Sequence, residues 1–152
     1  MNILAFDTSL SQFSLALYLS EKIVFYMRCE EDNKPAEKLV STIDEALKDD
    51  KIEHTDINYV AVTKGPGSFS GIRVAIACAQ AMCFATSAKP IVFTTFDICC
   101  SRAKKQIGSN IQNIYVILKA HAQAYYVQSF DLQNCIQTNY KIMSFSALIL
   151  TT

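Results

Sequence analysis

Two short segments combine residue types that could bind an anionic ligand. Asp7-Thr8-Ser9 follows an apolar run that reads as a strand, and a carboxylate beside hydroxyls at the carboxyl end of a strand is a common ligand position in α/β folds. The second segment, residues 65–71, lies between a strand and a helix, where Ser68 or Ser70 can cap the helix and exposed N–H groups suit an anion. Each segment also has a purely structural interpretation: an Asx-turn that closes a hairpin, and a connection into a packed helix.

Other familiar chemistries do not fit. The turn at 65–71 lacks the Lys-Ser or Lys-Thr pair of a P-loop, and Ser70 stands where the dinucleotide-binding fingerprint needs glycine. His54 lies in a polar loop and His121 in a turn without a nearby carboxylate, so the sequence offers no hydrolytic triad. The six cysteines form no C-x-x-C pair and mostly lie in apolar runs, which is typical of buried thiols in a reducing cytosol. We therefore expect no catalytic residue, no metal site and a cytoplasmic location.

The composition predicts a globular protein. Hydrophobic residues make up 51% of the 152 positions and charged residues 18%, whereas disordered chains are more charged and less apolar. Polar residues interrupt every apolar run before the ~18 residues that a membrane span needs, and the N-terminus does not resemble a signal peptide. We therefore expect no membrane association.

The zero net charge hides an uneven distribution. Residues 1–56 carry a net charge of −6 and residues 57–152 a net charge of +6. An acidic surface helix followed by ordinary loops explains this pattern, and a basic face for a partner or RNA is the alternative. The basic residues are scattered and no aromatic-basic RNA motif is present, so direct RNA binding is the weaker hypothesis.

The hydrophobic periodicity predicts a β-β-β-α-β-α-β-α domain in residues 1–106 and the start of a second domain in residues 107–152. The second domain has two predicted strands, and Ser144 could cap a short helix at its end. The predicted strands are 2–7, 13–19, 22–28, 57–63, 91–94, 114–118 and 125–130, and the predicted helices are 36–48, 72–85, 96–106 and 145–150.

The helix at 72–85 has an unusual pattern. Arg73 and Gln80 are its only polar side chains, so it is apolar nearly all round, whereas a surface helix shows one apolar stripe. It should therefore be covered on two sides, by the sheet on one side and by another helix or another protein on the other. The helix at 36–48 carries an ordinary stripe that includes Leu39, Ile43 and Leu47.

The segment from Gly65 to Arg73 resembles the TsaB (YeaZ) family. The usual family wording is G-P-G-S-F-T-G-[ILV]-R, and only the threonine differs here. Asp7-Thr8-Ser9, the three-strand opening and Lys89-Pro90 match as well, so the resemblance covers residues 1 to about 130. It implies the actin-like ATPase fold (the ASKHA, ribonuclease H-like fold of sugar kinases and Hsp70). The matching motif residues are Gly65, Pro66, Gly67, Ser68, Phe69, Ser70, Gly71, Ile72 and Arg73.

The resemblance also implies a function. The family takes part in making threonylcarbamoyladenosine at position 37 of tRNA, as a non-catalytic subunit that binds and stabilises the transferase TsaD through packed helices, with the ATPase TsaE joining them. We therefore expect an inactive paralogue of TsaD that forms a homodimer when alone and reaches tRNA only indirectly. The expected partner interface comprises Leu39, Ile43, Leu47, Ile72, Ala75, Ile76, Ala79, Met82 and Cys83.

Three departures bear on that expectation. The helix at 36–48 lacks the histidine pair that binds metal in TsaD-like enzymes, and Lys119 stands where the second phosphate turn would need an acidic residue. The chain also ends at Thr152, earlier than family members, either naturally or by truncation, so its short second domain should lean on the first domain or a dimer mate. The alternative is an active ATPase or kinase of this fold, or the older M22 glycopeptidase label. We expect no cofactor, with ATP bound at most within the complex, and a vestigial phosphate-binding role for Asp7, Thr8, Ser9, Gly65, Gly67 and Ser68.

Overall fold

A computed structural model describes residues 1–10, 13–29, 38–108, 110–133, 136–144 and 146–147. The chain divides into two compact units, Met1–Phe93 and Thr94–Thr152.

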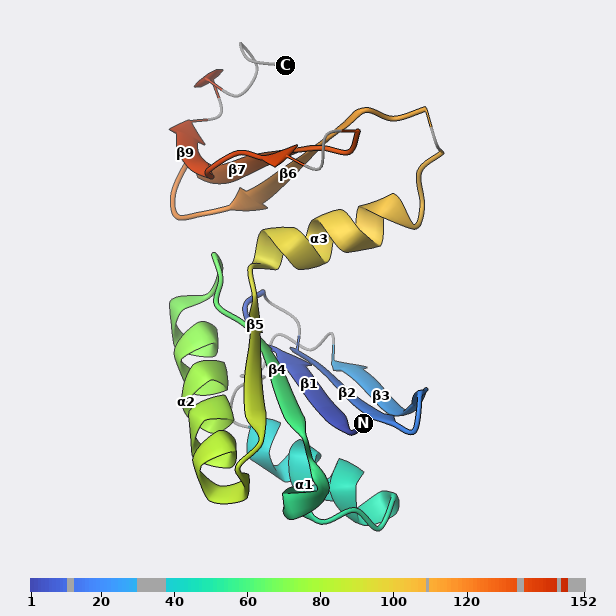
Figure 1. Cartoon of the computed structure of the whole chain (residues 1–152). Helices are drawn as coiled ribbons and strands as arrows, with labels where there is room; N and C mark the ends of the chain where they lie inside the picture. The colour runs from blue at the N-terminus through green and yellow to red at the C-terminus, as the bar shows by residue number, and fades with distance from the viewer. Residues whose placement is uncertain (11–12, 30–37, 109, 134–135, 145, 148–152) are drawn as a thin grey trace. The chain divides into compact units, whose positions relative to one another are not determined.

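The first unit contains a five-stranded sheet in the order β3-β2-β1-β4-β5 (Figure 1). β2 pairs antiparallel with β1 and with β3, whereas β1, β4 and β5 run parallel. Ser20 and Glu21 join β2 to β3 with φ values of 47° and 69°, which is the backbone sign that a two-residue hairpin needs. The predicted three-strand opening is confirmed. The strands are β1 (Ile3–Asp7), β2 (Phe13–Leu19), β3 (Lys22–Cys29), β4 (Tyr59–Thr63) and β5 (Lys89–Phe93).

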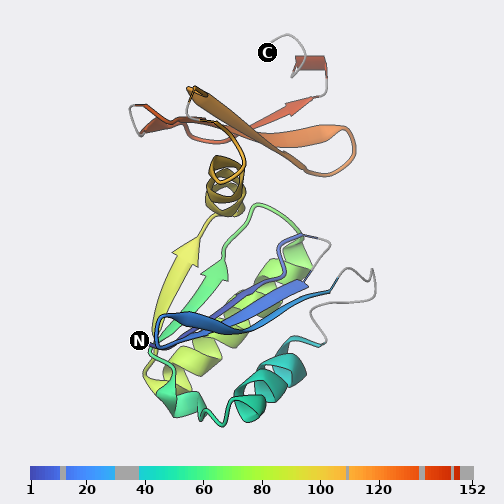
Figure 2. The ribbon, with the colours of Figure 1, turned by 90° about the vertical axis from the view of Figure 1, so that its right-hand side faces the viewer.

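Two helices cover one face of this sheet (Figures 1 and 2). Helix α1 (Leu39–Asp49) follows β3, a 3₁₀ turn η1 (His54–Asp56) precedes β4, and helix α2 (Phe69–Thr86) connects β4 to β5. Alternate residues of the strands point towards the helices, as the two-residue period of a strand requires. They form one apolar core with both helices, and its strand residues are Leu4, Phe6, Phe13, Leu15, Leu17, Val60 and Val62.

One of the two covers predicted for α2, the sheet, is present in this unit, and the second cover stays a prediction. Of the buried residues of α2, Ala75, Ala79 and Met82 pack in the core with the sheet. Gly71 lies against the backbone of Thr8, and the residues on the opposite face of the helix are exposed. The helix is long and apolar enough to cross a membrane by length and composition alone, with a mean hydropathy of 1.4. Its place alongside β4 and β5 in Figure 1 shows instead a helix that packs on a sheet with one face.

The second unit packs one helix against a four-stranded sheet. Helix α3 (Thr95–Lys104) begins with a capping box, in which Thr94 and Asp97 each bind the other's backbone N–H group. Phe96 and Cys100 of α3 form the core of this unit with residues 114, 116 and 130 of the two strands that follow the helix. The strands are β6 (Asn113–Lys119), β7 (Ala124–Asp131), β8 (Ile136–Gln137) and β9 (Lys141–Ser144), and β6, β8 and β9 all pair with β7.

Two features of the second unit differ from the sequence prediction. The tail adds two short strands, so the second domain is not a two-stranded piece, whereas most of the predicted final helix, Phe145 and 148–150, lies outside the described residues. The sequence also placed the third helix in a first domain that ends at residue 106, whereas the compact units divide after Phe93. The reason is that Phe96 and Cys100 bury their side chains against β6 and β7.

Candidate functional site

The two segments that the sequence singled out lie against each other. The Thr8 hydroxyl donates a hydrogen bond of 2.7 Å to the carbonyl oxygen of Gly71, and the Ser68 N–H group donates one of 2.6 Å to the carbonyl oxygen of Ser9. Thr8 and Ser9 are 1% and 0% exposed. The turn after β1 and the turn before α2 therefore form one junction inside the first unit.

The glycines of the motif are required by this junction. A Cβ atom on Gly67 would overlap the carbonyl oxygen of Ser9, and a Cβ atom on Gly71 would overlap that of Thr8. Gly65 has a φ of +93°, a conformation that favours glycine. The spacing of glycines in the motif thus follows from close backbone packing.

Asp7 binds groups of its own chain. Its Oδ1 atom accepts hydrogen bonds from the Ser9 N–H group at 2.8 Å and from the Thr63 hydroxyl at 2.5 Å. The bond to Ser9 is the Asx-turn that the sequence offered as the structural interpretation. The sequence reasoning missed Thr63, although it ends β4, which runs parallel to β1, and the ends of parallel neighbours meet at one sheet edge.

Ser68 caps α2. Its Oγ atom accepts a hydrogen bond from the Gly71 N–H group at 3.3 Å, which satisfies one of the orphan donors at the helix N-terminus. Of the two predicted candidates it is therefore Ser68 that forms the cap, while Ser70 Oγ lies 3.4 Å from Ser68 Oγ. The predicted vestigial phosphate-binding residues Asp7, Thr8, Ser9, Gly65, Gly67 and Ser68 thus lie together, and several of them bind one another.

The second predicted phosphate turn lies in the other unit. It connects β6 to β7. The Ala120 N–H group donates a hydrogen bond of 2.9 Å to the carbonyl oxygen of Ala124, and the Ala124 N–H group donates one of 3.1 Å to the carbonyl oxygen of His121. Lys119 and His121 are exposed there. This turn is a closed hairpin connection with a lysine and a histidine in place of a carboxylate.

Metal and thiol chemistry receive little support from the part of the chain that is described. Within those ranges, no three His, Cys, Asp or Glu side chains cluster so that they could hold a metal ion. Burial raises the pKa of the Cys78, Cys83 and Cys100 thiols. These cysteines therefore favour the protonated form, which is a poor nucleophile and metal ligand.

Most of the predicted partner interface is core. Six of its nine side chains are buried in the first unit, and Ile72, Ile76 and Cys83 are half-buried at its margin. The prediction is corrected for the six buried side chains, because the apolar stripe of a helix faces its own sheet first. These six are Leu39, Ile43, Leu47, Ala75, Ala79 and Met82.

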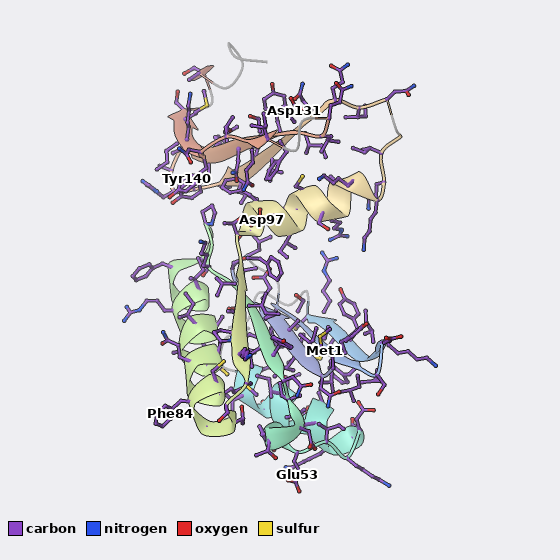
Figure 3. All side chains as sticks on the ribbon, in the orientation of Figure 1. Met1, Glu53, Phe84, Asp97, Asp131 and Tyr140 are labelled. Carbon is purple, nitrogen blue, oxygen red and sulfur yellow. The ribbon has the colours of Figure 1, made fainter. Side chains whose placement is uncertain are left out.

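A different set of residues is accessible on α2. Phe84 is 94% exposed and projects away from the helix in Figure 3, and Phe69 is 76% exposed. The Arg73 guanidinium lies 5.3 Å from the centroid of the Phe69 ring, within cation–π distance. We call the exposed residues the α2 outer face, which comprises Phe69, Ser70, Arg73, Val74, Ala77, Gln80, Ala81, Phe84 and Ala85.

The exposed side of α1 has the opposite character. Lys48 and Asp44 form an ion pair of 2.6 Å one turn apart, and this pairing lowers the pKa of the exposed Asp44 carboxyl. Val40 is the one apolar residue among the exposed positions of the described helix, Leu39–Asp49. Of the two helices of the first unit, α2 therefore exposes more large apolar side chains than α1.

Comparison with known proteins gives a family. The family model of TsaD, tRNA N6-adenosine threonylcarbamoyltransferase, matches residues 32–143. A tRNA threonylcarbamoyladenosine biosynthesis protein TsaB of Buchnera aphidicola subsp. Schizaphis graminum is 34% identical over 110 residues, which are 69% of this chain and 52% of that protein. The TsaB of Buchnera aphidicola subsp. Baizongia pistaciae is 44% identical over 78 residues, which are 51% of this chain and 35% of that protein.

The fold is also found among solved structures. YeaZ from Pseudomonas aeruginosa superposes with a TM-score of 0.81 at 20% sequence identity, over 94% of this chain and 67% of that one. The predicted actin-like, ribonuclease H-like fold is thereby confirmed. The chain spans about half the length of the first of these curated relatives and about a third of the second. The chain belongs to the family of TsaD, and its TsaB relatives at 34% and 44% identity support a place in the TsaB (YeaZ) group.

Proposed function

We propose that this chain takes part in tRNA threonylcarbamoyladenosine biosynthesis as a non-catalytic subunit that binds and stabilises TsaD. The names of the curated relatives support the pathway. The observation that carries the binding role is the α2 outer face, where two exposed phenylalanines flank small residues. TsaE joins the same assembly, tRNA is reached through it, and the site of action is the cytoplasm.

The α2 outer face has the properties of a helix-packing surface. Ala77 and Ala81 lie between Phe69 and Phe84 on the exposed side, and small residues let a second helix approach to the ~8 Å at the close end of the usual range. Each phenylalanine can bury on the order of 150–250 Å². Arg73 is the single charged residue of this face, so docking desolvates few charges. In the absence of TsaD, the same face forms a homodimer.

The decisive experiment uses charge insertion on this face. We expect Ala81→Glu and Phe84→Glu to abolish co-elution with TsaD in size-exclusion chromatography with light scattering, and to lower threonylcarbamoyladenosine formation in a reaction reconstituted with TsaD, TsaE and tRNA. Ile23→Glu is the matched control, because Ile23 is 65% exposed on the β3 edge of the same unit. Unchanged complex formation by both α2 variants, or binding of the chain to lipid vesicles in place of TsaD, would contradict the proposal.

The enzymatic alternative has a separate test. An active ATPase or kinase would use Asp7 and the turn at 65–71 to bind phosphate, yet Asp7 Oδ1 already accepts bonds from Ser9 and Thr63. We expect calorimetry with ATP and Mg²⁺ to detect no tight binding to the chain alone. Tight binding that Asp7→Ala abolishes would favour the enzyme and overturn the non-catalytic role.

A further inference from the structure

The turn that follows β1 forms two hydrogen bonds with the start of α2. Thr8 binds the carbonyl oxygen of Gly71 through its side chain, and Ser9 accepts the Ser68 N–H group through its backbone. The contacts to Gly67 and Gly71 are so close that neither glycine leaves room for a Cβ atom. The two turns therefore fit in one arrangement, and that arrangement sets where α2 begins.

Only one end of the α2 outer face is next to this junction. Phe69 lies two residues before Gly71, whereas Phe84 lies near the other end of the helix, about 22 Å away along the axis at 1.5 Å per residue. Thr8 itself is 1% exposed, so its side chain is inaccessible to a partner. Its influence on a bound partner must act through the first turn of α2.

We propose that Thr8 is a positioning residue for partner binding: its hydroxyl fixes the first turn of α2 and thereby the place of Phe69 on the α2 outer face. This inference rests on the proposed function, because it assumes that TsaD binds that face. It gives the Asp7-Thr8-Ser9 turn a task in assembly that requires no bound phosphate. Phe69 contacts the partner directly, whereas Thr8 acts indirectly, through its hydrogen bond to Gly71 in the first turn of α2.

Hydrogen exchange tests the local effect. Thr8→Val keeps the side-chain shape and removes the donor, and we expect it to speed amide exchange in the first turn of α2, residues 69–73, by about fivefold, the effect of losing one typical hydrogen bond. Exchange in the last turn, residues 82–86, should stay within twofold. Thr8→Ser, which keeps the hydroxyl, should restore the wild-type profile. Equal acceleration along all of α2 would mean a general loss of stability and would overturn the positioning role.

Affinity for TsaD tests the consequence. We expect Thr8→Val to weaken binding about fivefold and to be non-additive with Phe69→Ala but additive with Phe84→Ala, because distant and independent sites add. Unchanged affinity of Thr8→Val, in a chain whose Phe84→Ala variant binds weakly, would overturn the positioning role alone. Unchanged affinity of both phenylalanine variants would overturn the proposed function and the positioning role with it. Should Thr8→Val fail to fold, Thr8→Cys replaces it, since a thiol is a weaker donor in the same place and should give an intermediate effect.

Discussion

The hydroxyl of Thr63, the last residue of β4, donates a hydrogen bond of 2.5 Å to the Asp7 carboxylate at the end of β1. The bond joins two parallel strands at the edge where the motif turns begin. Because Asp7 also accepts the Ser9 N–H group, its carboxylate ties β4 to the turn after β1. This carboxylate is therefore a structural link in the first unit.

Replacement of Thr63 by valine removes that link without changing the shape of the side chain. Bonds to charged groups contribute about 1.5–3 kcal/mol, so we expect Thr63→Val to lower the free energy of unfolding by about 1.5 kcal/mol in urea titrations. Thr63→Ser keeps the hydroxyl and should lie much closer to wild type. Equal losses from the two variants would show that packing of the methyl group, and not the bond to Asp7, stabilises the edge.

The close contact at Gly71 predicts a large effect of the smallest possible side chain. A Cβ atom there would overlap the Thr8 carbonyl oxygen, and overpacking of this kind costs about 1–3 kcal/mol. We expect Gly71→Ala to lower the urea midpoint strongly or to prevent soluble expression. Gly108→Ala is the matched control, because a Cβ atom on Gly108 meets nothing within 4 Å, and a midpoint shift as large as that of Gly71→Ala would contradict the explanation.

The packing of α3 on the second sheet predicts a local effect of Phe96→Ala. Phe96 is fully buried, and its truncation should cost about 3–5 kcal/mol. We expect hydrogen-exchange protection to be lost in β6 and β7 while β1 and β4 stay protected. Ile98→Ala, on the exposed side of the same helix, should leave the pattern unchanged, and loss of protection in β1 and β4 on Phe96→Ala would place α3 in the first unit instead.

Buried thiols predict a pH dependence of stability. Burial raises the pKa of Cys78 in the folded chain, so the folded state keeps a proton that the unfolded state releases. The resulting contribution to stability is complete below the ordinary thiol pKa of about 8.5 and is lost as the pH rises through the raised value. We expect Cys78→Ala to flatten the fall in unfolding free energy between neutral and alkaline pH, and an unchanged slope would contradict this assignment.

Much of the first unit was predictable because its elements carry strong local signals. The alternating strands 13–19 and 22–28 and the periodic stripe of Leu39, Ile43 and Leu47 match the observed β2, β3 and α1. The stripe indicates which side of α1 is apolar, but it does not indicate which other element that side packs against. The same residues were therefore predicted to bind a partner, whereas they pack on the sheet of their own unit.

The sequence names the residues of the candidate site, but it does not predict the contacts between them. The sequence singles out the residues around Asp7 and Gly65–Gly71, yet no local signal indicates that Ser68 binds Ser9 or that Thr63 binds Asp7, because these contacts depend on strand order. The strands β8 and β9 were missed for another reason. β8 has only two residues, which is too few to show a two-residue period, and the four residues of β9 place the apolar Ile142 and Met143 side by side instead of alternating.

Because Gly67 and Gly71 have no room for a Cβ atom, the structure limits what can be inferred from the nine-residue motif about the function of a protein that contains it. These glycines permit close contact between two backbone segments, and the fold needs that contact whether or not the protein performs chemistry. A catalyst and a scaffold that share this junction would both need these two glycines. The glycines of the motif thus indicate the fold of a protein that contains them, and they do not by themselves indicate which reaction it catalyses.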